Sequence, residues 1–244
     1  MLHGTNVSTN ALHRDAMIEK KTVKWIFIVF LLSVMIGIGY LSAFSSVSRS
    51  GFVRSWLGEY SSQLISDSRS DDHFFIRLAS AGVERTKYKV RYDPAYVRIP
   101  YPNGDVPAGM GVCTDEIVRA YRRVGIDLQA GVHEDMKEVF WSYPKLWRMT
   151  GPDPNIDHRR VPNLMVYLTR KGSVLPIDND PLIYRPGDIV AWELSNGLLH
   201  IGLVVVPRSR DGKRHLIVHN IGQGPKLEDA LFVGRIIGHF RYQP

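Results

Sequence analysis

The sequence predicts an α+β protein, in which helices come first along the chain and antiparallel strands follow. Two observations predict this class. Apolar residues recur with the spacing of one helical face in the earlier part of the chain, and from Pro186 they alternate with the period of two that is typical of strands. Asp211-Gly212 lies between two β-branched runs and is typical of a connection between antiparallel neighbours. Strands grouped after helices indicate α+β rather than a parallel α/β sheet.

The N-terminal region predicts a membrane anchor. Residues 1–24 are polar, and Trp25–Phe44 then runs for 20 residues without a charge. At about 1.5 Å per residue, this run spans the roughly 30 Å hydrocarbon core of a bilayer as one transmembrane helix. A cleaved signal peptide is the alternative, but its apolar region usually covers only about 7–15 residues.

The charges beside this run predict its orientation. Lys20, Lys21 and Lys24 precede it directly, so the positive-inside rule places residues 1–24 in the cytoplasm as a tail. Residues 45–244 then lie outside, which predicts a single-pass protein of the inner (cytoplasmic) membrane with its globular part in the periplasm. A lone cysteine in an oxidising compartment has no partner in the chain for a disulfide, which favours a functional reason for its presence.

Two segments lead from the anchor to the globular part. Residues 45–70 are expected to form a linker and a helix, and residues 71–244 a single domain. Helical spacing covers Phe52–Ile65 and His73–Val83, whereas Tyr88–Ile99 alternates more like extended chain. A loop rich in Pro and Gly then leads to the only cysteine.

Cys113 is expected at the start of a helix. The apolar positions that share one face of this helix are Ile117, Ala120, Tyr121 and Val124. At such a position the free N–H groups and the positive end of the helix dipole lower the pKa of a thiol, and the thiolate is the nucleophile. The alternative is a small buried apolar residue, and the carboxylates of Asp115 and Glu116 oppose a thiolate.

An irregular excursion separates this helix from the next one. Val132–Trp141 has helical spacing, but residues 140–160 are interrupted by Pro and Gly, which is typical of a lid or a binding loop. A further helix follows residue 160, with Pro162 in its first turn and Gly172 at its end.

Four strands are expected in the last third of the chain, and two of them carry histidines at their ends. The predicted strands are Asp188–Glu193, His200–Val206, His215–Ile221 and Ile236–Tyr242. If the second and third pair, His200 lies near His219 and Asn220. A cysteine facing a histidine that a third polar group orients is an activated nucleophile. His200 would be the base, and His219 or Asn220 would fix its tautomer; either histidine could instead be a hydrogen-bonded core residue.

The order of these motifs resembles the NlpC-type cell-wall cysteine peptidases, which share a papain-like fold with the CHAP amidases. The residues that carry this resemblance are Tyr101, Cys113, Pro186-Gly187-Asp188-Ile189-Val190, His200-Ile201-Gly202 and His219. The chain is also similar, over about residues 70–243, to the bacterial domain-of-unknown-function family 1287. The residues shared with that family are Cys113-Thr114-Asp115, Asp157-His158-Arg159-Arg160, Pro186-Gly187-Asp188 and His219-Asn220-Ile221-Gly222.

The resemblance implies that residues 71–244 form a papain-like catalytic domain, with N-terminal helices packed on an antiparallel sheet. It implies Cys113, His200 and His219 as catalytic residues that hydrolyse an amide bond in peptidoglycan or a related wall peptide. Tyr101 lies twelve positions before Cys113, the spacing at which that family places a tyrosine beside its nucleophile.

Further candidates for orienting, oxyanion or substrate contacts are Asn220, Tyr101, Asp115, Asp157, His158 and Arg159. Asp157 and His158 could also be metal ligands together with Asp153. They lack a recognised ligand spacing, so we expect no metal and no cofactor, and expect both residues to cap the following helix and shape a pocket wall.

The partners expected from the sequence are peptidoglycan or a wall peptide, and the membrane through residues 25–44. The formal net charge of +7 is not concentrated in a run of arginines interleaved with aromatics, which argues against a nucleic acid. Two other functions stay open. One is a papain-fold acyl or amide transferase, and the other is a non-catalytic wall-binding module in which Cys113 only packs.

Overall fold

The computed structural model describes residues 72–244 of the chain. The predicted tail, the predicted span at residues 25–44 and the predicted helix at Phe52–Ile65 lie outside these residues. Within residues 72–244, no helix has both the length and the apolar composition needed to cross a bilayer.

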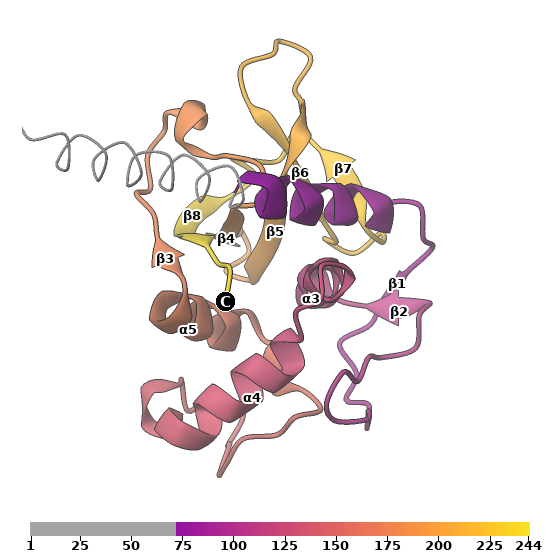
Figure 1. Cartoon of the computed structure of the whole chain (residues 1–244), viewed down its shortest axis with the longest axis vertical. Helices are drawn as coiled ribbons and strands as arrows, with labels where there is room; N and C mark the ends of the chain where they lie inside the picture. The colour runs from indigo at the N-terminus through magenta and orange to yellow at the C-terminus, as the bar shows by residue number, and fades with distance from the viewer. Residues whose placement is uncertain (1–71) are drawn as a thin grey trace, which may run out of the picture. The chain divides into compact units, whose positions relative to one another are not determined.

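A six-stranded antiparallel sheet forms the centre of the described domain (Figure 1). Its strands follow the order β3-β8-β4-β5-β6-β7. In that order they are Ser173–Val174, Arg235–Arg241, Ile189–Glu193, Leu199–Arg208, His215–His219 and Lys226–Glu228. A separate parallel pair joins β1 (Arg91–Tyr92) to β2 (Met110–Gly111).

The four predicted strands of the last third of the chain are confirmed as β4, β5, β6 and β8, with ends shifted by one or two residues. The prediction missed β3 and β7, because strands of two and three residues show no period. The predicted extended segment Tyr88–Ile99 contributes only Arg91–Tyr92 to a strand.

Helices lie on one side of the six-stranded sheet (Figure 1). They are residues 72–85, α3 (Cys113–Arg123) and α5 (Val161–Lys171), all of which begin or end near the predicted positions. The helix α4 (Leu128–Val139) packs on α3 and α5 instead of on the sheet. Single 3-10 turns occur at η1 (Phe140–Ser142), η2 (Asp157–Arg159) and η3 (Pro181–Ile183).

The two faces of the sheet bury two separate apolar layers, because side chains alternate along each strand. Ile189, Ala191 and Ile201 belong to the layer shared with the helices. Val190 and Trp192 belong to a smaller layer on the other face, closed by Leu231 and its neighbours. Helices that precede and cover an antiparallel sheet confirm the α+β class.

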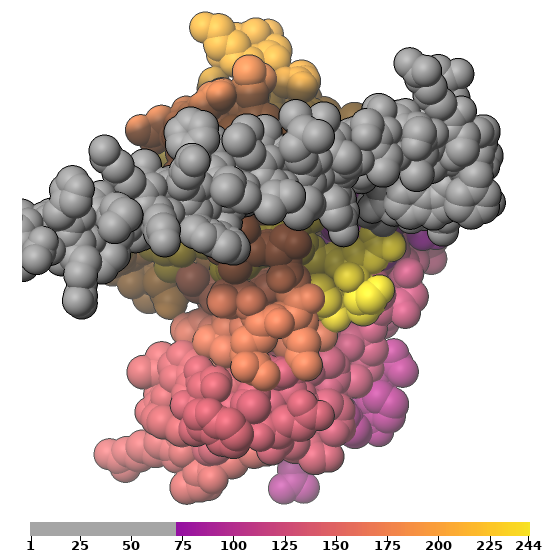
Figure 2. Space-filling view, turned by 60° about the vertical axis from the view of Figure 1, so that its left-hand side comes forward, coloured from indigo at the N-terminus to yellow at the C-terminus, as the bar shows by residue number. Residues whose placement is uncertain are grey.

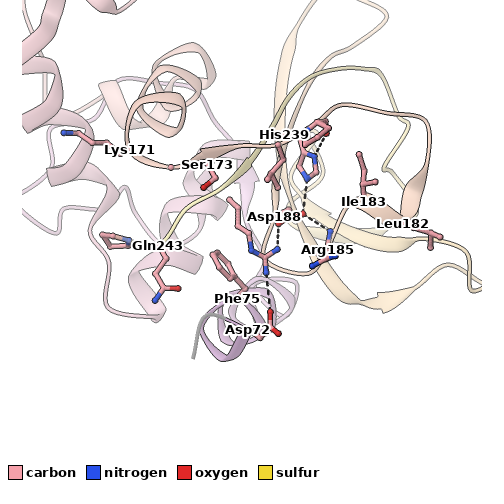
Figure 3. Close-up of a pocket in the computed structure, with 15 residues that line it drawn as sticks. Asp72, Phe75, Lys171, Ser173, Leu182, Ile183, Arg185, Asp188, His239 and Gln243 are labelled. Carbon is pink, nitrogen blue, oxygen red and sulfur yellow. Dashed lines mark hydrogen bonds and ion pairs between the residues drawn. The ribbon is translucent and has the colours of Figure 1, made fainter. Parts of the chain in front are cut away.

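The Pro186-Gly187-Asp188 motif builds the turn into β4. Gly187 has φ +90°, and a side chain there would also clash with Phe75. The buried Asp188 carboxylate receives hydrogen bonds from His239 and Arg241 of β8 at 2.9 and 2.6 Å (Figure 3). This motif therefore fixes β8 beside β4. Figure 2 shows the C-terminal residues beside the segment around β3, as the pairing of β3 with β8 requires.

Candidate active site

Cys113 is the first residue of α3, as predicted. The helix begins there because the Asp115 carboxylate accepts a hydrogen bond from the Val112 N–H at 2.6 Å, which satisfies a donor left open at the helix start. The Thr114 hydroxyl donates to the Arg159 carbonyl at 2.8 Å and fixes the same turn from the other side. Only 3% of the Cys113 surface is exposed.

The buried ion pair of Asp115 and Arg159 holds this helix start in place. Arg159 reaches both oxygens of Asp115, at 2.9 and 3.1 Å, and both side chains are almost fully buried. Arg159 also donates to the carbonyls of Ala95 and Asp93. Asp115 and Arg159 were candidates for substrate or oxyanion contacts, but their charges and hydrogen bonds are used to join α3 to η2 and to the chain after β1.

A hydrogen-bonded chain of three side chains starts at the predicted base. His200 Nε2 lies 2.8 Å from His219 Nδ1, and His219 Nε2 lies 2.9 Å from a carboxylate oxygen of Glu228. A carboxylate only accepts, so His219 carries its proton on Nε2 and accepts through Nδ1. His200 must then donate from Nε2, which leaves Nδ1 of a neutral His200 as the acceptor.

The thiol lies against the strand that carries His200. The backbone N–H of Ile201 donates a hydrogen bond to the Cys113 sulfur, which places the sulfur one residue along β5 from His200. His200 is itself buried, stacked on Trp192 with ring centroids 5.8 Å apart. The His200 ring stacks on Trp192, which belongs to the layer on the face of the sheet away from the helices, whereas Cys113 and Ile201 belong to the layer shared with the helices. The fold therefore joins His200 to His219 and places the sulfur beside the neighbouring residue of β5, and no hydrogen bond within residues 72–244 links the Cys113 sulfur to the His200 ring.

Burial sets the protonation states of Cys113 and His200. Burial raises the pKa of Cys113 to about 11, and hydrogen bonds from the Ile201 and Thr114 N–H groups offset only part of that rise. Burial, followed by the neighbouring His219, lowers the pKa of His200 to about 3. The expectation that the helix start lowers the pKa of the thiol is therefore wrong, because loss of hydration outweighs the helix N–H groups. Both side chains are neutral at pH 7.

Asn220 does not share the orienting role that it was a candidate for. Its side-chain oxygen accepts from the Gly222 and Gly224 N–H groups and forms the turn after β6. Its amide donates to the Gly111 carbonyl at 3.4 Å, two residues before Cys113. Asn220 ties the end of β6 to the segment that enters α3, and of the two candidates only His219 is hydrogen-bonded to His200.

The tyrosine beside the nucleophile is Tyr92 and not Tyr101. Tyr101 donates to Glu134 on α4 and packs its ring against His133, away from the cysteine. The Tyr92 hydroxyl is hydrogen-bonded to Cys113, and burial together with this contact raises the pKa of Tyr92 to about 12. Sequence spacing missed Tyr92 because the pairing of β1 with β2 carries it to the site.

Cys113 opens into a cavity of about 550 Å³. The lining residues are Tyr92, Pro94, Val112, Cys113, Leu146, Trp147, Ile156, Arg159, Arg160, Val161, Pro162, Gly197, Leu198 and Leu199. Residues of the excursion at 140–160 form one wall of this cavity, and its role as a lid or a binding loop stays a prediction. Trp147 and Arg148 both have positive φ, 57° and 54°, a strained conformation for residues with a side chain.

Asp157 and His158 lie behind this wall and do not line the cavity. Burial raises the pKa of Asp157 to about 6, and its carboxylate faces Arg160 and the Asp153 N–H. Burial also lowers the pKa of His158 to about 4. The predicted capping role is wrong, because Arg160 is the N-cap residue of α5 and no side chain caps this helix; the Asp157 carbonyl instead accepts from the Asn163 side chain. Residues 72–244 contain no cluster of three or more His, Cys, Asp or Glu side chains arranged to hold a metal ion.

A larger cavity of about 910 Å³ lies beside β8 and is lined by His239, Asp188 and Ser173 (Figure 3). Its histidine cannot act as a base for the serine. His239 Nε2 faces the Asp188 carboxylate and Nδ1 faces the Pro176 carbonyl at 2.7 Å, so acceptors occupy both ring nitrogens.

A cysteine at a helix start, packed on an antiparallel sheet that carries a buried histidine pair, defines an α+β protein with a candidate cysteine-nucleophile site. The chain belongs to the family described as "Domain of unknown function (DUF1287)", whose model matches residues 79–242. The predicted family is confirmed.

The chain is also similar to individual proteins. The chain is 52% identical over 151 residues to "Uncharacterized protein YijF" of Escherichia coli (strain K12), covering 62% of this chain and 73% of that protein. Among solved structures, it is similar to NlpC1 from Trichomonas vaginalis with 15% identity and a TM-score of 0.38, covering 69% of this chain and 44% of that one.

Proposed function

We propose that this protein is a papain-like cysteine hydrolase that cleaves an amide bond with Cys113 as its nucleophile. The observation that carries the proposal is the chain from Glu228 through His219 to His200, which ends one residue along β5 from the contact with the cysteine sulfur. In this chain one nitrogen of His200 is occupied by His219, and no side chain or carbonyl within residues 72–244 is hydrogen-bonded to its other nitrogen. Two buried histidines in series, directed by a carboxylate, fix a tautomer.

The tautomer gives His200 its role. Nδ1 of His200 takes the thiol proton while the Cys113 sulfur bonds to the substrate carbonyl carbon. The same nitrogen then gives that proton to the amine nitrogen as the C–N bond breaks, which leaves a thioester. A water molecule then gives a proton to the same nitrogen of His200 as its oxygen bonds to the thioester carbon. The C–S bond breaks, the carboxylic acid leaves, and His200 returns the proton to the Cys113 sulfur.

The resting pair is a neutral thiol and a neutral imidazole, because the pKa of Cys113 is raised to about 11 and that of His200 is lowered to about 3. The proton therefore moves during the attack and not before it. Negative charge that develops on sulfur and on the carbonyl oxygen meets the N–H groups of Ile201 and Thr114, which already face the sulfur.

The proposed substrate is a peptide amide of peptidoglycan or a related wall peptide, and the proposed location is the periplasmic face of the inner membrane. The sequence supports both through the motif order shared with NlpC-type peptidases and through the uncharged run at residues 25–44.

Two alternatives make different predictions. A papain-fold transferase would use the same residues but pass the acyl group to an amine, so product analysis with and without an added amine separates it from a hydrolase. A non-catalytic wall-binding module fits the buried, neutral thiol of Cys113. Such a module would bind wall material and release no fragments from it.

The test is digestion of purified peptidoglycan by residues 46–244, with mass analysis of the fragments. Cys113→Ser is nearly isosteric and should fold normally, but its hydroxyl is a much weaker nucleophile, so hydrolysis should be lost. His200→Ala should lower kcat by about 10²- to 10⁴-fold because the general base is removed. Equal digestion by wild type and Cys113→Ser would show that Cys113 only packs.

A further inference from the structure

The charged residues that line the Cys113 cavity are all cationic. These residues are Arg159 and Arg160, and no carboxylate faces into the cavity from the lining. Arg159 is fully engaged with Asp115 and with the carbonyls of Ala95 and Asp93. Arg160 is therefore the lining cation with hydrogen-bonding capacity left for a ligand.

Arg160 is held in one orientation by three contacts. Its Nη1 lies 3.3 Å from the Asp157 carboxylate and 3.0 Å from the Met149 sulfur, and its guanidinium carbon lies 4.3 Å above the Trp147 ring. Its Nε and Nη2 donate no hydrogen bond to any residue in the described range 72–244. These two N–H groups form the side-on edge of a guanidinium, whose parallel donors match the two oxygens of one carboxylate.

The apolar lining of the cavity favours ligand binding at the Nε/Nη2 edge of Arg160. Large apolar side chains that are partly exposed gather around the cavity, and such patches mark ligand-binding grooves. They are Tyr92, Leu146, Trp147, Leu198 and Leu199, exposed by 38 to 63%. Apolar walls lower the local dielectric constant, so an ion pair formed among them is stronger than one in water. Trp147 has a positive φ, and its ring lies under the Arg160 guanidinium.

The local charge favours a monoanion. The Asp157 carboxylate already faces Arg160, so a dianionic phosphate would meet a like charge without a second free cation to balance it. We propose that the Nε/Nη2 edge of Arg160 binds a free carboxylate of the substrate in the Cys113 cavity, so that the protein selects peptide or acyl amides with an acidic group near the scissile bond. This inference rests on the proposed function for the identity of the reacting bond, but the carboxylate site can be tested separately.

The first test uses bromoacetyl affinity labels for Cys113. The probes are bromoacetyl-glycine, bromoacetyl-β-alanine and bromoacetyl-γ-aminobutyrate, each compared with its carboxamide at pH 7 by intact mass. At the best length, the acid should label Cys113 about tenfold faster than the amide, which corresponds to about 1.4 kcal/mol. In Arg160→Gln the ratio should fall to about 1, and Arg160→Lys should lie between because a lysine cannot bind side-on with two donors.

Arg148→Gln is the matched control. It removes the same charge from another position of the same excursion, but Arg148 is exposed and does not line the cavity, so the ratio should stay near the wild-type value. An unchanged ratio in Arg160→Gln would overturn the proposal. Faster labelling by bromoacetyl-aminoethylphosphonate than by the carboxylate of equal length would overturn the choice of a carboxylate.

A second measurement does not depend on the reactivity of Cys113. The arginine Nε–H resonance that disappears in Arg160→Gln identifies Arg160 in two-dimensional ¹⁵N NMR spectra. The unreactive acetyl acids should shift this resonance and their carboxamides should not; an unshifted resonance at saturating acid would overturn the site. If the resonance shifts but no amide is hydrolysed, the proposed function fails and the carboxylate site remains.

Discussion

Cys113 shows how a folded environment can reverse the expectation from a local motif. The helix start supplies N–H groups that stabilise a thiolate, but the sulfur is almost completely buried. The loss of hydration destabilises the thiolate more than the N–H groups stabilise it, so the pKa rises. Tyr92 adds a hydroxyl that is hydrogen-bonded to the same sulfur. Cys113 is thus a neutral thiol at pH 7, and in the proposed mechanism His200 removes its proton.

The pH dependence of alkylation tests this protonation state. Because the pKa of Cys113 is raised to about 11, the rate of iodoacetamide labelling should rise with pH through pH 9 without a plateau. His200→Ala should show the same profile, since the His200 imidazole is neutral in this range. The urea-unfolded chain is the control, with a thiol that titrates near about 8.5. A plateau below pH 7 in the native protein would reveal a stored thiolate.

The strand β7 adds the third side chain of the hydrogen-bonded chain. Glu228 of β7 lies directly opposite Ile217 of β6. Ile217 and His219 are two residues apart on β6 and point to the same face of the sheet, so the Glu228 side chain reaches His219 diagonally. Its carboxylate raises the pKa of His219, against the lowering caused by burial. A strand of only three residues therefore decides which ring nitrogen of His219 carries the proton.

Glu228→Gln separates this orienting role from a structural one. Gln keeps an acceptor oxygen and lacks the charge, so the pKa of His219 should fall further, as measured by NMR of the imidazole, and kcat should fall by up to about tenfold. Asp229→Asn is the matched control, because Asp229 pairs with Arg214 and does not touch His219. Equal kinetics and equal His219 titration in the two variants would remove Glu228 from the site.

The pair of Asp115 and Arg159 joins α3 to η2 and to the chain after β1. Arg159→Met leaves a buried carboxylate without its partner, so the free energy of unfolding in urea should fall by about 3–5 kcal/mol. Arg123→Met is the control, because its pair with Glu84 is exposed and 3.7 Å long, and the expected change is below about 1 kcal/mol. Adding Asp115→Asn to Arg159→Met should restore part of the loss. An effect of Arg159→Met as small as the control would show that the pair is not needed for the helix start.

Buried neutral histidines make the stability of the whole domain depend on pH. The pKa of His158 is lowered to about 4 and that of His200 to about 3, whereas the unfolded chain binds these protons near about 6.5. The stability they contribute is present above pH 6.5 and is lost as the pH falls toward 4. Asp157 has the opposite effect. Its pKa is raised to about 6 in the folded protein, so as the pH falls the folded protein binds this proton before the unfolded chain does, which stabilises the fold.

The free energy of unfolding in urea should accordingly fall as the pH decreases from 6.5 to 4.5. The reason is that the pKa is lowered for His158, His200 and His219 and raised for Asp157, so the histidines determine the sign. Glutamine does not bind a proton in this range. In His158→Gln the free energy of unfolding should therefore fall less with decreasing pH, because unfolding takes up one proton fewer. His73→Gln, at an exposed position, should leave the slope unchanged. Parallel slopes in all three proteins would contradict the neutral burial of His158.

The attachment of the chain to a membrane is a prediction from residues 25–44 and lies outside the described residues. If this run is an uncleaved anchor, the full chain should stay in the membrane fraction at high salt, keep Met1–Lys24, and expose its domain to protease from the periplasmic side. Recovery of a soluble chain that begins near Ser45 would identify a cleaved signal peptide instead.

By itself, the sequence determined the α+β class, the start of α3 at Cys113 and the strands that carry His200 and His219, because these follow from local periodicity and capping. Only the tertiary structure decided the rest. The parallel pairing of β1 with β2 put Tyr92 in the place expected for Tyr101, and the register of β7 brought Glu228 to His219. Burial reversed the expected shift in the pKa of the thiol. Which side chains meet, and how much water they lose, depends on residues far apart in the sequence, and local patterns do not record those contacts.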